Sequence, residues 1–407
     1  MTEADQARYH AGLKLGEGNF TAATKLARQY LELTGAAAPV VGHALIELDD
    51  LVRERGVSVG PRIDDGVVTP TAQLLVGLPQ HAQWAAAYQP PPLRLFQLGP
   101  CTAVCPNLLL TAGGKLINDN IGYNNAELCA HLPPEFPGIA SSHKHIVLAV
   151  RHRDTARVKE PALYLPATTN YAAWLFGSLP RLAAYTRQPE LAQLPIVLHG
   201  DAKPYQLASL AMMGVPRERL IMHGAQVRLE CRALHYCSTS YLHHAPSVTG
   251  ILHVRDHVAR AVAGAAGASG PKRLYLARRK ARDRPLLNEN EVIALFERHG
   301  FTAIDPEDHG FEEQARFAAG AEIIAGPYGA NLANLVFAHR ARKCLILATK
   351  QQPEFARLAG ALNIACWHVV PDAIKLREGR TISESYGFSA NLDHTGAALQ
   401  ACLAGET

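Results

Sequence analysis

Short apolar runs of strand length alternate with amphipathic helical segments over residues 272–370, and this alternation constrains the fold more than any other feature of the sequence. Runs rich in β-branched residues predict buried strands, and the segments between them have apolar residues at helical spacing. The predicted strands are 272–277, 301–305, 321–326, 343–348 and 365–370, and the predicted helices are 288–299, 311–320, 331–338 and 352–362. This order predicts a parallel sheet whose strands are joined by right-handed crossovers.

A second alternation of the same kind precedes the first. Its predicted strands are 144–150, 194–200 and 218–224, and its predicted helices are 171–186, 205–214 and 254–266. Apolar runs with Gly and Asn turns between residues 93 and 140 predict further strands and hairpins. The flexible stretch GAAGASGP at 264–271 is the best interdomain linker in the chain. The sequence therefore predicts two α/β domains, over residues 91–266 and 270–375.

Residues 5–57 are predicted to be helical, because apolar residues such as Leu13, Ala23 and Tyr30 recur at helical spacing. Their pattern is similar to one helix pair of tetratricopeptide type. One such pair cannot bury its own apolar face, so we expect it to pack on the main body or on a protein partner. The run QPPPL predicts a linker that ends a helical extension over residues 1–90.

Composition narrows the class of protein. The 407 residues include 40 basic and 36 acidic side chains, and no basic run is interleaved with aromatic residues, which argues against a nucleic-acid partner. Eight scattered cysteines without a CxxC pair indicate reduced thiols. The first residues lack the apolar core of a signal peptide, and no apolar stretch is long enough to span a bilayer. We therefore expect a cytoplasmic protein, and docking on a membrane enzyme stays open.

A turn of small residues, Gly326–Asn331, follows the predicted strand 321–326 and leads into a helix. Small residues at the carboxyl end of a strand let a ligand approach the backbone, and the N-terminus of the next helix attracts anions. A diphosphate or a group of sugar hydroxyls would fit such a turn. The alternative is a plain tight turn of the kind found in every α/β protein.

A basic loop follows the predicted strand 272–277. Its five cations, within seven residues, are Arg278, Arg279, Lys280, Arg282 and Arg284. Asn288 and Glu291 then predict an N-cap with a capping-box pair. Cations before a helix N-terminus repel its dipole unless an anion neutralises them, and arginine binds phosphate in a bidentate manner. The loop therefore predicts a nucleotide diphosphate site, with a solvated basic loop as the alternative.

Both features belong to a segment, 273–338, that resembles glycosyltransferase family 61, also described as domain of unknown function 563. The family pattern has a strand ending in Arg, an Arg and an Asn-Glu pair, a helix with Gln, and a Gly-x-His-Gly-Ala-x-Leu-x-Asn turn. The matching positions are Arg278, Arg284, Asn288, Glu289, Gln314, Gly326, Gly329, Ala330, Leu332, Asn334 and Phe337. A weaker match, NYAAWLFGSLPRL at 170–182, is similar to the family's Asn-Tyr-x-His-Trp-x-x-Glu/Asp segment.

The resemblance implies a GT-B fold, with two Rossmann-like domains facing a cleft and a small helical N-terminal extension. Residues 91–266 would bind the acceptor, 270–375 the donor, and a tail helix within 376–407 would cross back to the first domain. The donor-binding residues implied are Arg278, Arg284, Asn288, Glu289, Gln314, Gly326, Tyr328, Gly329, Ala330, Asn331 and Asn334. The implied reaction is inverting transfer of a hexose or pentose from a nucleotide sugar, with a UDP-sugar favoured, to a glycan or polysaccharide acceptor. Peripheral docking on membrane-bound polysaccharide machinery fits this reaction.

The chain departs from the family pattern on the acceptor side. Ala173 stands where the family has His, Gly177 where it has an acid, and Tyr328 where the turn has His. A tyrosine can donate a hydrogen bond but cannot act as a base at neutral pH. Either the acceptor chemistry has shifted, or the chain is a non-catalytic nucleotide-sugar-binding or scaffold protein.

An inverting transfer needs a base near the acceptor hydroxyl and stabilisation of the leaving diphosphate. Arg278 and Arg284 are the candidates for stabilising the diphosphate. Asp201, which follows the predicted strand 194–200, is the candidate base, although a loop aspartate is more often a cap or turn residue.

Histidine pairs raise the question of a metal. His143 and His145 form one pair and His243 and His244 another, but neither has a third ligand at a recognisable spacing. We therefore predict no metal and no required cofactor, with the nucleotide sugar acting as a substrate.

Overall fold

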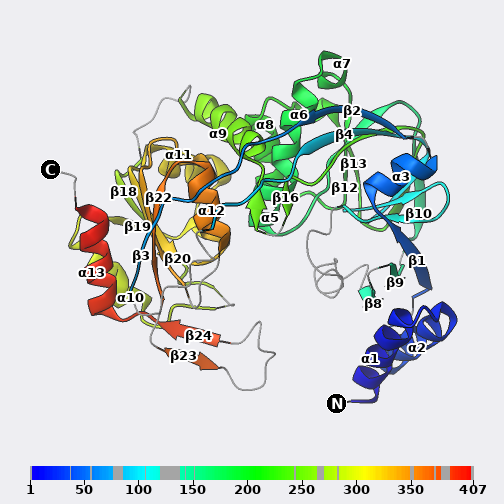
Figure 1. Ribbon diagram of the computed structural model, residues 1–407, viewed down its shortest axis with the longest axis horizontal. Helices are drawn as coiled ribbons and strands as arrows, with labels where there is room; N and C mark the ends of the chain where they lie inside the picture. The colour runs from blue at the N-terminus through cyan, green and yellow to red at the C-terminus, as the bar shows by residue number, and fades with distance from the viewer. Residues whose placement is uncertain are drawn as a thin grey trace.

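The computed structural model describes residues 2–36, 38–55, 57–76, 86–105, 107–119, 138–142, 144–150, 152–242, 244–263, 270–281, 284–348, 353–370, 373–376 and 386–404. The fold is mixed α/β. Figure 1 shows two sheets at one end, a central group of helices, a parallel sheet, and outer helices at the far end. Most of the linker predicted at 264–271 lies outside the described residues.

A six-stranded parallel sheet, the C-terminal sheet, has the order β19-β18-β20-β21-β22-β3. Its strands are β3 (Ala72–Val76), β18 (Arg273–Leu276), β19 (Thr302–Ile304), β20 (Ile323–Pro327), β21 (Lys343–Leu347) and β22 (Ala365–Val369). Successive residues of its strands face opposite sides, as Leu274 and Tyr275 do in two different apolar clusters. The parallel sheet predicted over 272–370 is confirmed.

Helices cover both faces of this sheet, in the positions that the sequence predicts for them. They are α10 (Glu289–Glu297), η5 (Pro306–Asp308), α11 (Phe311–Gly320), η6 (Ala330–Phe337), α12 (Pro353–Ala361) and α13 (Leu392–Leu403). The predicted helix 331–338 is a 3-10 helix, η6. Apolar residues of α10 and α13 share one cluster, whereas those of α11, η6 and α12 join the cluster on the opposite face.

Two more sheets form the N-terminal half. The central sheet has the order β13-β12-β11-β15-β4-β2, and the first four strands in this order are parallel. Its strands are β2 (Ser58–Ile63), β4 (Leu93–Leu98), β11 (Ala162–Tyr164), β12 (Ile196–His199), β13 (Leu220–His223) and β15 (Leu234–Cys237). The outer sheet is mixed and contains β10 (Asp154–Val158), β14 (Val227–Cys231), β5 (Cys101–Cys105), β6 (Leu108–Thr111), β7 (Leu116–Ile117), β1 (Val40–Ile46), β9 (His145–Ala149) and β8 (Gly138–Ser141), in that order.

Helices between the central and C-terminal sheets join them through one apolar core. They are α5 (Tyr171–Ala173), a π-helical turn η2 (Trp174–Ser178), η3 (Leu179–Arg181), α6 (Leu182–Thr186), α8 (Pro204–Met212) and α9 (Val248–Ala263). The short helices α7 (Pro189–Ala192) and η4 (Arg217–Arg219) precede β12 and β13. A single cluster of buried residues runs from Leu163 and Leu198 of the central sheet to Leu274 and Ile324 of the C-terminal sheet. The two sheets therefore share a continuous core through this layer.

The helical prediction for residues 5–57 holds only at the start and at α3 (Leu48–Arg55). The helices α1 (Glu3–Gly16) and α2 (Phe20–Leu33) form the predicted pair, and they pack on β8 and β9. Residues 40–46 are a strand instead, because the β-branched pair at its start fits an extended chain. The predicted extension 1–90 thus supplies β1, β2 and β3, one strand to each sheet.

The tail also differs from its prediction. Helix α13 does not cross back to the first half, because its buried residues Ala398, Leu399 and Cys402 pack in the cluster that covers the outer face of the C-terminal sheet. Two short antiparallel pairs complete the described elements: β16 (Tyr241–Leu242) with β17 (Ala245–Pro246), and β23 (Ala373–Leu376) with β24 (Tyr386–Ser389).

Candidate functional site

The strand order of the C-terminal sheet marks one place for a ligand. Within 270–370 the first strand, β18, lies between the second and the third, β19 and β20, so the chain reverses direction across the sheet between β18 and β20. In open α/β sheets, ligands bind beyond the carboxyl ends of the strands at such a switch point. The basic loop follows β18 and the glycine turn follows β20, so the fold places both predicted features at this switch point.

Arg278, Arg284 and Tyr328 meet there. The Arg278 Nη1 donates a hydrogen bond to the Tyr328 carbonyl oxygen at 2.7 Å. The Arg284 guanidinium lies 5.3 Å from the centroid of the Tyr328 ring. Two cations 6 residues apart in sequence therefore lie against one residue of the glycine turn, at the position predicted for a diphosphate.

Gly326 and Gly329 of the turn lie so close to Leu276 and Arg278 that a side chain would not fit at either position. A Cβ on Gly326 would lie 2.6 Å from the Leu276 carbonyl oxygen, and a Cβ on Gly329 would lie 2.3 Å from the Arg278 Cζ. The Asn331 Nδ2 donates to the same Leu276 carbonyl at 2.8 Å, which fixes the turn to the end of β18. Ala330 begins η6 directly after the turn.

The basic loop is partly neutralised within the fold. Arg279 pairs with Asp305, its Nε lying 2.8 Å from Oδ2, and Lys280 pairs with Asp308. The hydrogen bond to Asp305 raises the pKa of Arg279. The expectation that all five cations need a bound anion is therefore wrong for Arg279 and Lys280, while Arg282 lies outside the described residues.

Asn288 and Glu289 support the ends of the basic loop through hydrogen bonds within the fold. Asn288 occupies the N-cap position of α10, but its side chain makes no cap hydrogen bond, so the predicted capping box is wrong. The Asn288 Nδ2 instead donates to the Ala390 carbonyl oxygen, and the Asn288 Oδ1 accepts from the Ala390 N–H, both at 2.9 Å. The Glu289 Oε1 accepts from the Arg278 backbone N–H at 2.8 Å, and burial raises the pKa of this carboxyl.

Gln314 and Asn334 lie at the junction with the N-terminal half. The Asn334 Nδ2 donates to the Gln314 Oε1 at 3.1 Å, and its Oδ1 accepts from the Tyr171 hydroxyl at 2.8 Å. Gln314 also donates to the carbonyls of Pro306 and His309. Since Asn334 is fully buried, this network fixes η6 against α5.

The weaker match, 170–182, forms the interrupted helix α5-η2-η3. Asn170 caps it by accepting from the Ala173 N–H at 2.9 Å, and the Trp174 Nε1 donates to Ser209 at 2.9 Å. Short π-helical turns such as η2 are frequently found at functional sites. The Gly177 carbonyl oxygen accepts a hydrogen bond from the Arg181 Nε at 2.6 Å.

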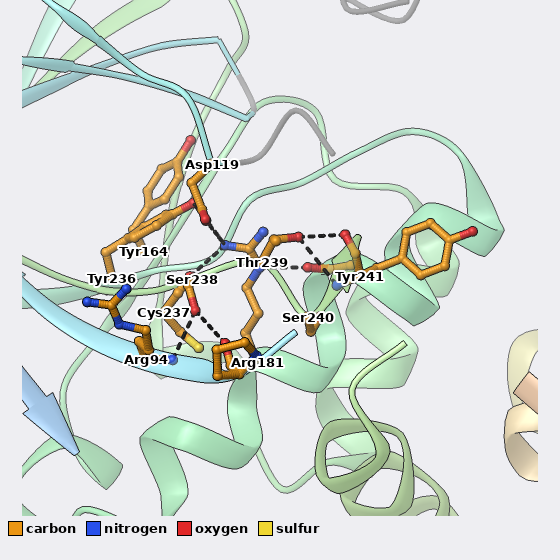
Figure 2. Close-up of polar contacts among 12 residues, drawn as sticks. Arg94, Asp119, Tyr164, Arg181, Tyr236, Cys237, Ser238, Thr239, Ser240 and Tyr241 are labelled. Carbon is orange, nitrogen blue, oxygen red and sulfur yellow. Dashed lines mark hydrogen bonds and ion pairs between the residues drawn. The ribbon is translucent and has the colours of Figure 1, made fainter. Parts of the chain in front are cut away.

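Arg181 centres a buried cluster that sequence reasoning missed. Figure 2 shows its guanidinium surrounded by Asp119, Tyr236 and the loop that follows β15. The Arg181 Nη1 donates to the Cys237 carbonyl at 2.6 Å and to the Tyr236 hydroxyl at 2.9 Å, and it lies 3.6 Å from the Asp119 Oδ2. Burial raises the pKa of the Asp119 carboxyl, and the charge of Arg181 opposes the shift.

Asp119 reaches this cluster from a distant part of the chain, so no local spacing indicated it. The signal that could have found the cluster is Arg181 itself, a cation within an otherwise apolar helical run. Asp201, the predicted base, is exposed after β12, and its Oδ1 lies 3.7 Å from the Cβ position of Gly224.

Glu354 is a second residue that the sequence did not single out, because it looked like one polar position of an amphipathic helix. It lies in the first turn of α12. Its Oε1 accepts from the Tyr241 hydroxyl at 2.5 Å, and its Oε2 accepts from the Tyr328 hydroxyl. Tyr241 belongs to the N-terminal half and Tyr328 to the glycine turn, so this carboxylate connects the two.

Comparison with known families gives one match. Residues 171–345 match the model of the family described as Glycosyltransferase 61. This match confirms the resemblance found from the motifs at 170–182 and 273–338, and it supports a glycosyltransferase. A search of curated proteins gives no match. Within the described part of the chain, no helix has the length and apolar character to span a membrane, and no group of three or more His, Cys, Asp or Glu could hold a metal.

Proposed function

We propose that the protein transfers a sugar from a nucleotide-sugar donor, with a UDP-sugar favoured, to a glycan or polysaccharide acceptor, because residues 171–345 match the model of the Glycosyltransferase 61 family. One observation carries the donor part of the proposal. Arg278 and Arg284 both lie against Tyr328 at the switch point of the parallel sheet. Arginines at such a point suit a diphosphate, which needs charge-assisted hydrogen bonds at a fixed place.

The proposed chemistry is inverting and needs no metal or cofactor. The acceptor hydroxyl loses its proton to a base, its oxygen attacks the anomeric carbon of the donor, and the bond to the diphosphate breaks. Arg278 and Arg284 would stabilise the negative charge on the leaving diphosphate. In the GT-B arrangement that goes with this reaction, the half containing β11 to β15 holds the acceptor.

Nucleotide binding tests the donor site. A thermal-shift screen with UDP-, GDP-, CMP- and dTDP-sugars identifies the nucleotide, and calorimetry then gives its affinity. Arg278→Ala should weaken binding by about 1.5–3 kcal/mol, the usual contribution of a charge-assisted contact. Arg279→Ala is the matched control, because Arg279 is paired with Asp305, and it should leave the affinity within about 0.5 kcal/mol of the wild type. Equal effects of the two substitutions would contradict the phosphate role of Arg278.

Asp201 is the proposed base, because it follows β12 at the carboxyl edge of the central sheet. In a transfer assay with a matched donor, Asp201→Asn should lower kcat by roughly 10²–10⁴-fold and leave donor affinity unchanged, since a base acts only in the chemical step. An unchanged kcat would remove Asp201 from the mechanism.

A non-catalytic nucleotide-sugar-binding or scaffold protein is the second candidate. Ala173 and Gly177 favour this second function, because neither residue has a group that can accept a proton from an acceptor hydroxyl. An enzyme should release free nucleotide slowly from its nucleotide sugar even without an acceptor, and a scaffold should bind the nucleotide sugar and release nothing. A nucleotide-sugar hydrolysis screen therefore separates the two functions.

A further inference from the structure

The two hydroxyls that donate to Glu354 come from two different loops, one in the N-terminal half and one at the glycine turn. Tyr328 is the residue of the glycine turn that contacts both Arg278 and Arg284. Tyr241 ends the loop 238–241, which follows β15 at the carboxyl edge of the central sheet. One carboxylate oxygen accepts a hydrogen bond from each phenol, so a single side chain connects the two loops.

Aromatic rings lie beside the two phenols that donate to this carboxylate. The Phe355 ring lies 5.0 Å from the Tyr328 ring and 6.1 Å from the Phe176 ring, and the Phe176 ring lies 5.6 Å from the Tyr241 ring. Hydrogen bonds from phenols to a carboxylate are charge-assisted, and apolar surroundings strengthen them. The two hydrogen bonds from Tyr241 and Tyr328 to the Glu354 carboxylate can therefore hold the two loops in a fixed relative position.

The loop 238–241 is itself tied to the buried cluster around Arg181. The Thr239 Oγ1 accepts from the Tyr241 N–H at 3.3 Å, and the Ser240 hydroxyl donates to the Phe176 carbonyl at 2.7 Å. Arg181 holds the carbonyl of Cys237, directly before this loop (Figure 2). A firmly held loop can transmit the position of Tyr241 to the rest of the N-terminal half.

We propose that Glu354 is a positioning residue for the transfer reaction: through Tyr241 and Tyr328 it sets the acceptor-side loop 238–241 in register with the donor-side turn. The inference rests on the proposed function, because it assigns the two loops to the two substrates of one transfer. Alignment of two reactants is sensitive to small displacements, and a shift of about 1 Å can cost roughly 10²-fold in rate.

Three substitutions separate positioning from proton transfer. Glu354→Ala removes both hydrogen bonds. Glu354→Gln keeps the length of the side chain, and its amide can accept from one phenol and donate to the oxygen of the other. Tyr88→Phe is the matched control, because Tyr88 also docks a phenol on α12, at the Arg357 carbonyl 3.1 Å away, without contacting Glu354.

The first measurement needs no ligand. Hydrogen exchange is followed at the amides of Ser238 and Tyr328, which donate to the carbonyls of Arg94 and Leu347. We expect Glu354→Ala to speed exchange at both amides by at least about tenfold, since local opening becomes easier when the bridge is lost. Glu354→Gln and Tyr88→Phe should stay within about threefold of the wild type. Unchanged exchange in Glu354→Ala would overturn the proposal.

The second measurement uses UDP-glucose hydrolysis and UDP binding. Glu354→Ala should lower kcat by about 10–100-fold while the Kd for UDP changes less than about threefold, and Glu354→Gln should recover most of kcat. If Glu354→Gln keeps normal exchange but loses as much kcat as Glu354→Ala, Glu354 is a proton acceptor and not a positioning residue. A wild type that neither binds UDP nor hydrolyses UDP-glucose counts against the proposed UDP-sugar donor, and the exchange measurement still decides whether Glu354 holds the loops.

Discussion

At the scale of single residues, Gly329 offers a test of the donor site that leaves every charge in place. Its backbone is extended, with φ at 169°, so an alanine there is not strained by its own conformation. An added Cβ would instead lie 2.3 Å from the Arg278 Cζ and push the guanidinium away from the turn. We expect Gly329→Ala to weaken nucleotide binding by about 1–2 kcal/mol, somewhat less than the loss of a charge-assisted contact, as measured by calorimetry.

The double variant makes this prediction specific. If Gly329→Ala acts through Arg278, the substitution should have little further effect in an Arg278→Ala background, because the displaced group is already absent. Additive losses in the double variant would mean that the glycine contacts the nucleotide by another route.

At the scale of elements, strand β22 carries a buried histidine that makes the C-terminal sheet sensitive to acid. His368 is 1% exposed, and burial lowers its pKa to about 4. The unfolded chain takes up a proton below about pH 6.5 and the folded chain does not, so stability is lost as the pH falls from about 6.5 to about 4. The loss should approach about 3 kcal/mol by pH 4.

Urea unfolding at several pH values checks this expectation. His368→Leu should flatten the decrease of the unfolding free energy between pH 6.5 and pH 4, whatever its effect at neutral pH. His339→Leu, at an exposed position, serves as the control. An equally steep decrease in His368→Leu and the wild type would show that other groups cause the acid sensitivity.

At the scale of the whole molecule, the N-terminal residues are part of all three sheets. Strand β1 lies between β7 and β9, β2 pairs with β4, and β3 pairs with β22. A chain beginning at residue 91 should therefore fail to fold cooperatively, because each sheet loses a strand and exposes apolar surface. A chain beginning at residue 38 loses only α1 and α2 and should keep a cooperative thermal transition, at a lower Tm. Circular dichroism distinguishes the two, and a normal transition in the shorter chain would contradict the prediction.

Much of the secondary structure and two short motifs could be predicted from the sequence. The alternation over 272–370 and the helix pair at the N-terminus follow from periodicity, which reports the face that each element buries. The turn at Gly326–Asn331 and the loop from Arg278 were also found, because their residues lie close together in sequence and match a family pattern. The switch point then followed from the order of strands and needed only the pairing of β18 with β20.

Only the tertiary structure shows which strands, helices and side chains that lie far apart in the sequence contact one another. The sequence does not show that residues 72–76 pair with β22 or that α13 packs on the C-terminal sheet, so the predictions for the extension and the tail differ from the structure. The pairing of Arg279 with Asp305 and the bridge from Glu354 to Tyr241 and Tyr328 join positions far apart in sequence. The sequence by itself determined which residues carry charge and, over residues 272–370, which segments are helices or strands. Only the packing decided which charges are neutralised within the fold and which lie at the junction of the two halves, because Coulomb and hydrogen-bond energies depend on distances in space.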